Sequence, residues 1–326
     1  MSGVIILGAG MAGLLAGNLF LKDGFLVNIN ERQPTLPHNH SALLRFRSSV
    51  VGEVTGVTFK KVSVMKWTMP FENPITDALA YAAKVSGIMR SDRSISAFDE
   101  VVERWVAPDD FILQLATPLK GDLHFSIDWS PHPDRLTDVP VISTMPMPAL
   151  MDMFDYPKAR RPDFQYCHGY NLIVTLNSYV NAYATIYVPS PHLPFNRVSI
   201  TGHTLVAEFA SPNLSYTDAH NEMHMRQQNG VTLIRETQAA LDLFGIPHQC
   251  AVTYAYRMQR FAKILPVDDD LRKTFMYWAS KEHNIYSLGR FATWRPGLLL
   301  DDLPQDIRKI TGWIKSGNYD LLRHMS

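Results

Sequence analysis

Three glycines close to the N-terminus have the spacing of a dinucleotide-binding turn. They are Gly8, Gly10 and Gly13 in the run GAGMAG, and seventeen residues separate Gly13 from Glu31. In such a turn the first glycine permits a sharp bend, the second lets the backbone approach a pyrophosphate, and the third lets a helix pack closely. An acid at the position of Glu31 accepts hydrogen bonds from a ribose. The residues predicted to bind a cofactor in this unit are Gly8, Ala9, Gly10, Met11, Ala12, Gly13, Glu31 and Arg32.

Two arginines and a threonine further along the chain are candidates for the same site. Arg45 and Arg47 alternate along one short segment, and a guanidinium group matches phosphate oxygens with bidentate geometry. The alternative is that both arginines belong to a solvated basic face. Thr144 follows the predicted buried strand Val139–Ser143, and ligands of doubly wound folds bind at the carboxyl ends of strands. A plain exit from strand to loop is the other interpretation of Thr144.

A second set of residues near the C-terminus predicts another contact with a long cofactor. The segment NIYSLGR contains Gly289, which lets the chain pass close to a ligand, and Arg290, which supplies a charged donor. Asp301 or Asp302 is expected to accept hydrogen bonds from ligand hydroxyls at the start of a helix that begins at Leu303. The N-terminus of that helix also offers free backbone N–H groups.

Apolar periodicity predicts the elements that position these residues. The strand Val4–Leu7, the helix Met11–Lys22 and the strand Phe25–Ile29 form a βαβ unit around the glycine turn. Residues 164–210 contain alternating runs separated by Pro, Gly and Asn, which predict antiparallel strands. The other predicted elements are the strands Val62–Met65, Leu123–Ile127 and Val252–Tyr256 and the helices Thr76–Val85, Phe98–Trp105, Thr217–Gln228 and Val231–Phe244.

Composition and charge limit the classes of partner. The chain has 326 residues, of which 46% are hydrophobic, and this suffices for a sizeable core. It carries 31 basic and 31 acidic residues, so no overall field draws it to nucleic acid or to an anionic membrane. Lys158, Arg160 and Arg161 form one local basic group, which is either a phosphate contact or an ordinary solvated turn.

Neither a membrane nor a metal is expected. The N-terminus lacks the basic region and cleavage site of a signal peptide, and no apolar run reaches the ~18 residues of a membrane span, so a cytoplasmic protein is predicted. The chain has only two cysteines, Cys167 and Cys250, and they lack metal-ligand spacing. This fits a reducing compartment better than a disulfide scaffold. His38 and His40 have no third ligand nearby in the sequence.

The two ends of the chain together resemble one group of flavoproteins. GAGMAG with Glu31 at the N-terminus, and ILPVDDDL followed by NIYSLGRFATW near the C-terminus, are similar to UDP-galactopyranose mutase, protoporphyrinogen oxidase and the flavin amine oxidases. The chain also looks like small FAD proteins encoded by tailed bacteriophages. The resemblance implies FAD as the cofactor, with Gly289, Arg290 and one of Asp301 and Asp302 along its ribityl chain and pyrophosphate. A second anchor of this kind favours FAD over NAD.

The resemblance and the element order together predict an α/β fold. A Rossmann-like FAD-binding domain would contain an inserted substrate domain built on an antiparallel sheet, of α+β type. The expected boundaries are 1–150 for the first part of the FAD-binding domain, 151–280 for the substrate domain and 281–326 for the C-terminal return.

The expected function is an FAD-dependent oxidoreductase that oxidises a C–N bond of an amine or amino-acid-like substrate by hydride transfer to flavin. An aromatic wall suits such a pocket, although core packing is the alternative for each aromatic. The candidates are Trp294, Tyr183, Tyr187 and Tyr256. No catalytic side chain and no oligomeric state are predicted.

Three other functions stay open. One is a flavin-dependent isomerase like UDP-galactopyranose mutase, which requires reduced flavin. Another is a phage enzyme that acts on an amino-acid adduct of thymine in DNA, so the partner is either a small-molecule amine or one linked to a nucleobase. The third is a flavin-binding protein without catalysis.

Overall fold

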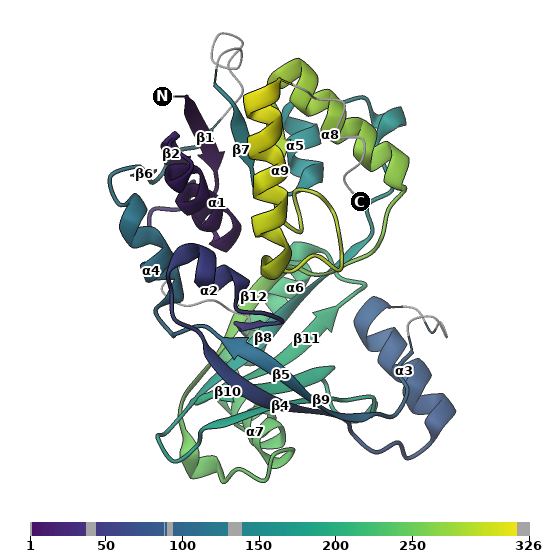
Figure 1. Ribbon diagram of the computed structural model, residues 1–326. Coiled ribbons are helices and arrows are strands. Elements are labelled where there is room, and N and C mark those ends of the chain that lie inside the picture. The colour runs from purple at the N-terminus through teal and green to yellow at the C-terminus, as the bar shows by residue number, and fades with distance from the viewer. Residues whose placement is uncertain (1, 37–43, 88, 90–93, 130–138, 318–326) are drawn as a thin grey trace.

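The computed structural model describes residues 2–36, 44–87, 89, 94–129 and 139–317, and these form two sheets (Figure 1). The first sheet has five strands in the order β13-β7-β1-β2-β6, and all of its pairings are parallel. Its strands are β1 (Gly3–Leu7), β2 (Leu26–Asn30), β6 (Leu123–His124), β7 (Val141–Ser143) and β13 (Ile285–Ser287). The last strand, β13, comes from the distant C-terminal part of the chain and pairs with β7.

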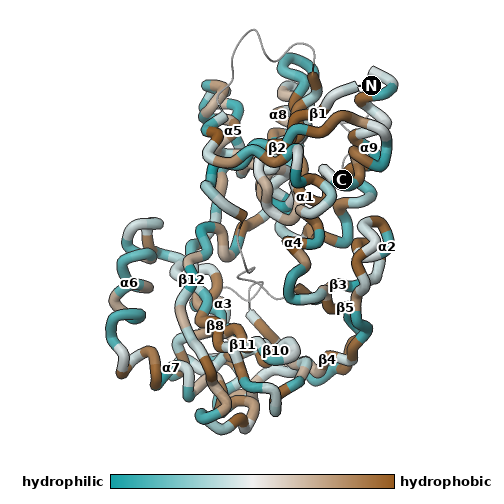
Figure 2. The backbone as a smooth tube through the Cα atoms, turned by 90° about the vertical axis from the view of Figure 1, so that its left-hand side faces the viewer, coloured by the Kyte–Doolittle hydropathy of each residue, from teal (hydrophilic) through white to brown (hydrophobic). Residues whose placement is uncertain are grey.

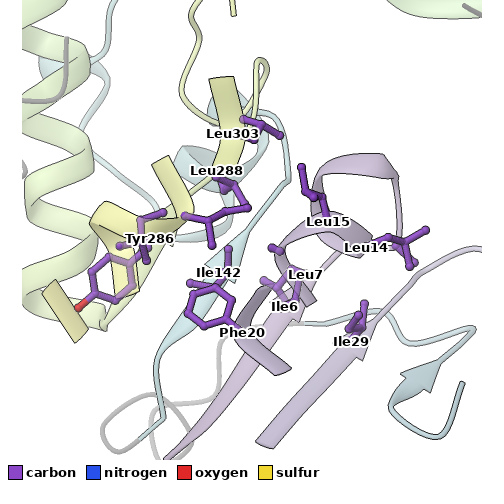
Figure 3. Close-up of a cluster of buried hydrophobic side chains, with 14 of the residues drawn as sticks. Ile6, Leu7, Leu14, Leu15, Phe20, Ile29, Ile142, Tyr286, Leu288 and Leu303 are labelled. Atoms are coloured by element: carbon purple, nitrogen blue, oxygen red, sulfur yellow. The ribbon is translucent and has the colours of Figure 1, made fainter. Parts of the chain in front are cut away.

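Helices cover the parallel sheet and share a core with it. Helix α1 (Met11–Lys22) lies next to α9 (Leu303–Ser316), as Figure 1 shows. Figure 3 shows side chains from α1, such as Phe20, beside Ile142 of β7 and Tyr286 of β13. Burial of these large apolar side chains, each worth about 1.5–3 kcal/mol, stabilises the unit.

Five further helices connect or flank the two sheets. In chain order they are α2 (Val50–Thr55), α3 (Pro74–Ser86), α4 (Phe111–Ala116), α5 (Met147–Met153) and α8 (Asp269–His283). Phe275 and Ala279 of α8 belong to the core of the parallel sheet. Within the described part of the chain, no helix is both long enough and apolar enough to cross a bilayer.

The second sheet has eight strands in the order β12-β8-β11-β10-β9-β4-β5-β3. Its pairings are antiparallel except that between β4 and β9, which is parallel. The strands are β3 (Arg45–Phe46), β4 (Lys60–Thr68), β5 (Asp99–Val106), β8 (Tyr166–Leu176), β9 (Ala182–Tyr187), β10 (Arg197–Gly202), β11 (Thr204–Ser211) and β12 (Ala251–Ile264).

The eight-stranded sheet has one apolar face and one polar face, because side chains alternate along each strand. On the apolar face, side chains such as Leu172, Val198 and Ala207 pack under α6 (Tyr216–Gln228) and α7 (Gly230–Asp242) in a second core. The intervening residues form what we call the polar face. Figure 2 shows the two units in one view, with α1 and β2 above and β8, β10 and β11 below.

The predicted fold class is confirmed, with a parallel α/β unit and a mainly antiparallel sheet. The predicted helix Phe98–Trp105 is wrong, because this segment forms β5 and pairs along its length with β4. Its valines at positions 101 and 102 favour a strand, and the spacing of its apolar residues does not distinguish the two structures. The strand expected at Leu123–Ile127 ends at His124.

The chain passes between the sheets more often than the expected boundaries of 1–150, 151–280 and 281–326 imply. Strands β3, β4 and β5 lie within residues 1–150 but join the eight-stranded sheet. Helix α8 lies mostly within residues 151–280 but packs into the core of the parallel sheet.

Candidate functional site

The three glycines of the N-terminal turn have different surroundings. Gly8 has φ +98°, and a Cβ there would lie 2.4 Å from the Thr144 hydroxyl oxygen. A Cβ on Gly13 would lie 1.9 Å from the Gly8 carbonyl oxygen, so α1 approaches the turn too closely for any side chain. A Cβ on Gly10 would meet no atom within 4 Å. Two glycines therefore serve packing within the turn, while Gly10 borders open space.

The N-terminus of α1 is suited to an anion. Its N-cap is Gly10, no side chain among the described residues caps it, and its first turn contains no acid. The first N–H groups of a helix lack partners within the helix and carry the positive end of its dipole. Such a terminus next to a glycine turn is a binding site for phosphate groups.

Glu31 lies directly beside this turn. Its carboxylate accepts a hydrogen bond from the Ala9 backbone N–H at 2.7 Å and one from the Gln33 N–H at 2.8 Å. The Glu31 backbone is held by the carbonyl of His124 on β6, at 2.8 Å. Arg32, the next predicted residue, is exposed.

Thr144 holds the turn from the neighbouring strand. Its hydroxyl donates to the Leu7 carbonyl oxygen at 2.7 Å, and its backbone N–H donates to the same oxygen at 3.1 Å. Thr144 therefore lies against Gly8, and its hydroxyl helps to shape the turn.

The C-terminal return meets the N-terminal turn at Gly289. This residue follows β13 with φ +97°, and a Cβ there would lie 3.3 Å from the Ala12 Cβ on α1. The N–H of Leu288 donates to the Ser143 carbonyl at 2.9 Å, which fixes the segment beside β7. The chain's two predicted cofactor contacts are thus adjacent in space.

Arg47, Asp301 and Asp302 contact one another. Arg47 donates to the Asp302 carboxylate at 2.6 Å, and both side chains are partly exposed. Asp301 accepts hydrogen bonds from the backbone N–H groups of Arg47 and Ser48, at 3.2 and 3.1 Å. The carboxylates expected to meet ligand hydroxyls therefore tie the segment after β3 to the start of α9.

Arg45 lies on the other sheet rather than at the glycine turn. Its guanidinium donates to the Thr185 hydroxyl at 2.8 Å and to the Ala184 carbonyl at 3.4 Å. Burial and the neighbouring Arg197 lower the pKa of Arg45 to about 10. The side chains of Arg45 and Arg47 thus lie in different places: Arg45 contacts the eight-stranded sheet, and Arg47 contacts the residues before α9.

A row of polar side chains crosses the polar face. Arg197 on β10 has Tyr187 of β9 on one side and Glu208 of β11 on the other, and Glu208 is opposite Asn171 of β8. Arg197 forms hydrogen bonds of 2.9 and 2.5 Å with the Glu208 carboxylate. Arg197, Glu208 and Lys263 were not among the predicted site residues, although a charged residue inside an apolar strand run such as TLVAEFA was a usable signal.

Arg290 lies between the glycine turn and the polar face. It follows Gly289 directly, and its Nε atom is buried without a hydrogen-bond partner among the described residues. Burial lowers its pKa, and Arg197 lowers it further, while Glu208 acts in the opposite direction. Arg290 is therefore close enough to the polar-face charges to interact with them.

The four predicted pocket aromatics separate into two groups. Trp294 is 1% exposed and donates its ring N–H to the Leu265 carbonyl at 3.0 Å, so it is a core residue. Tyr256 belongs to the apolar-face core, where its hydroxyl bonds to Glu236. Tyr183 and Tyr187 lie on the polar face in register with Thr201 and Arg197.

Two other groups of charges have structural partners. A cavity of about 530 Å³ lies beside Trp294 and the start of α9, and two of its charged residues, Arg295 and Asp306, pair with each other. In the basic group after α5, Arg161 bonds to Asp152 and to the Tyr156 carbonyl. The predicted loop histidines His38 and His40 lie outside the described residues.

Comparisons with known proteins identify the fold. No protein-family model and no curated protein matches the chain. Among solved structures, a reduced UDP-galactopyranose mutase has a TM-score of 0.68 at 12% identity, over 99% of this chain and 97% of that chain. An oxidoreductase from Methanosarcina mazei has a TM-score of 0.57 at 11% identity, over 95% and 100%. A putrescine oxidase has a TM-score of 0.55 at 11% identity, over 96% and 99%. The chain therefore has the fold of FAD-dependent flavoproteins.

Proposed function

We propose that the protein is an FAD-dependent oxidoreductase that oxidises a C–N bond of an amine or amino-acid-like substrate. The observation that carries this proposal is the open space at Gly10, at an uncapped helix N-terminus and beside the Glu31 carboxylate. A pyrophosphate fits the open space at the helix N-terminus, and a ribose hydroxyl fits the Glu31 carboxylate. The fold shared with flavoproteins supports FAD as the dinucleotide.

The chain supplies recognisable parts for such a cofactor. The backbone of residues 8–13 would hold the pyrophosphate, and Glu31 would bind the ribose. Gly289 would let the C-terminal return pass close to the ligand, while Asp301 and Asp302 keep that return attached to the segment after β3. When bound, FAD supplies the two-electron acceptor that the protein itself lacks, and oxygen or an external acceptor would reoxidise it.

The polar face would then be the substrate side of the site. It is the one face of the eight-stranded sheet not covered by α6 and α7, and Arg290 joins it to the glycine turn. Its side chains would orient the substrate, and the surrounding protein would exclude water from the reacting atoms.

The test begins with the absorbance spectrum of the purified protein, followed by heat release and chromatography of any bound compound. Flavin bands with released FAD, and bleaching by an amine or amino acid under anaerobic conditions, are the expected results. A colourless protein that does not bind added FAD would contradict the cofactor assignment.

The alternatives give different results in the same assay. A mutase-like isomerase would bind a sugar nucleotide and need pre-reduced flavin, with no net oxidation. An enzyme acting on a thymine adduct would be reduced by modified DNA and not by free amines. Bound FAD that no substrate reduces would indicate flavin binding without catalysis.

A further inference from the structure

Positive charges from four separate segments gather around one carboxylate. Arg197 of β10 bonds directly to Glu208 of β11. Arg45 of β3, Lys263 of β12 and Arg290 of the C-terminal return all interact electrostatically with the same carboxylate. Four cations therefore surround a single anion, although the whole chain has no net charge.

Three of these cations have no carboxylate partner among the described residues. Within the same residues, Arg45 donates to the neutral Thr185 hydroxyl and Ala184 carbonyl. In the described segments, the side chains of Lys263 and Arg290 form neither an ion pair nor a hydrogen bond. Burial lowers the pKa of both groups, and the neighbouring Arg197 lowers each further. Arg45, Lys263 and Arg290 are each partly buried. A charge that is partly removed from water without a partner costs free energy, and a bound anion would reduce that cost.

The cluster is open to a ligand and close to the predicted cofactor site. The side chains of Arg197 and Glu208 are 33% and 18% exposed to solvent. Arg290 directly follows Gly289, where an added Cβ would lie 3.3 Å from the Ala12 Cβ on α1. A ligand held by the cluster would therefore lie next to whatever the turn binds.

We propose that Arg45, Arg197, Lys263 and Arg290 form an anion site on the polar face that binds a carboxylate of the substrate. This inference rests on the proposed function, and it narrows the substrate from amines in general to amines that carry a carboxylate. Guanidinium groups bind carboxylates in bidentate fashion. Thr185, whose hydroxyl accepts from Arg45, and Tyr187, which is in register with Arg197, lie beside these groups. A diamine would bring a second cation into this cluster and be repelled.

The phosphates of a nucleotide are the other source of such an anion. For the cofactor, the structure provides a separate phosphate site at the N-terminus of α1. We therefore assign the cluster to the substrate and use two anions and one cation as probes, namely benzoate, inorganic phosphate and benzylamine. Benzoate and benzylamine share a ring and differ in the sign of their charge.

The experiment is a calorimetric titration of each probe into the FAD-loaded protein, with FAD affinity measured in parallel. The test variant is Lys263→Met, which removes a charge that has no hydrogen-bond partner in the part of the chain that the structure describes. Lys263→Arg keeps the charge, and Lys61→Met is the matched control, because Lys61 is exposed on the same sheet and pairs with Glu103. If Lys263→Met does not fold, as judged by circular dichroism, Arg45→Met replaces it.

We expect benzoate to bind the wild type and the Lys61→Met protein equally, and Lys263→Met to weaken it by roughly tenfold or more with FAD affinity unchanged. Lys263→Arg should bind benzoate nearly as the wild type does. Equal benzoate affinity in Lys263→Met, or benzylamine binding that matches benzoate, overturns the proposal. The proposal is also overturned if phosphate binds and benzoate does not, or if Lys263→Met lowers the affinity for FAD and leaves the affinity for benzoate unchanged.

Failure of the proposed function is distinguishable from failure of this inference. If the protein retains no FAD, or if no amine reduces its flavin, the proposed oxidoreductase function is contradicted. Benzoate titration into the flavin-free protein, with the same variants, still measures the anion site.

Discussion

Gly10 and Gly13 are three residues apart, yet substitution should affect different properties. Gly10 has φ −69° and ψ 175°, which any residue adopts, and its missing Cβ faces open space. We expect Gly10→Val to fold with nearly unchanged stability and to lose FAD, because the new side chain occupies the pyrophosphate position. Thermal unfolding measures the stability, and the amount of bound flavin measures the loss of FAD. Gly312→Val, at an exposed position of α9, is the control. Normal FAD occupancy in Gly10→Val would contradict the assignment of the turn.

Gly13→Ala should instead destabilise the protein. Its Cβ would lie 1.9 Å from the Gly8 carbonyl, so α1 must move away from the turn. Overpacking of this kind costs about 1–3 kcal/mol. Urea denaturation should show a lower midpoint with an unchanged slope, and a midpoint equal to that of the wild type would mean that the close approach is not maintained in solution.

The Arg197–Glu208 pair predicts a dependence of stability on pH. Burial raises the pKa of the Glu208 carboxyl, but Arg197, Lys263 and Arg45 together lower it below its ordinary value. A lowered pKa in the folded state stabilises the protein above the unfolded pKa of about 4.3, and this stabilisation is lost as pH falls through the folded pKa. Glu208→Gln should therefore flatten the acid side of a plot of Tm against pH.

The same variant should lower stability at pH 7, because it leaves Arg197 without its carboxylate. Removing one partner of a buried ion pair costs about 3–5 kcal/mol, and the partial exposure of Arg197 places the expected loss below that range. A Glu208→Gln protein as stable as the wild type at pH 7, with the same acid limb, would show that the pair contributes nothing.

At the scale of elements, the contact between the segment after β3 and α9 should control cofactor retention. Asp301 binds two consecutive backbone N–H groups of that segment, and Asp302 binds Arg47. We expect Asp301→Ala to weaken FAD binding several-fold while the fold persists, because the C-terminal return loses an anchor. Asp163→Ala, at an exposed position with a single local hydrogen bond, is the control. Equal FAD dissociation constants for both variants would contradict this role.

The elements with strong local signals were predictable from sequence. Helix α1 begins at Met11 and ends at Lys22 as expected, because its apolar spacing and the Asp23-Gly24 stop are both local. Strand β5 was not predictable in this way, since its partner β4 and the sheet beyond it decide its conformation. The predicted glycine turn depends on adjacent residues, whereas the polar cluster depends on register among β9, β10 and β11 that no local pattern specifies.

At the scale of the whole molecule, two hydrophobic cores are joined by several chain crossings. Strand β3 leaves the parallel-sheet unit, and α4 and α8 return to it, so the core of the parallel sheet is built from several segments. The buried residues of the second core all lie between Tyr170 and Tyr256, and Trp67 and Met69 of the N-terminal part pack against them. We expect a single cooperative unfolding transition rather than one for each sheet. Circular dichroism and tryptophan fluorescence should give coincident urea curves, and two separated transitions would contradict this expectation.

The division of the eight-stranded sheet into two faces also bears on how the protein changes over generations. Residues that would contact substrate occupy one set of alternate positions, and those that hold α6 and α7 occupy the other. A substitution on the polar face therefore leaves the packing beneath it in place. Mutations outside the Arg197–Glu208 pair can therefore alter which compounds this sheet accepts at little risk to folding, so the architecture permits substrate preference to diversify while the underlying scaffold persists.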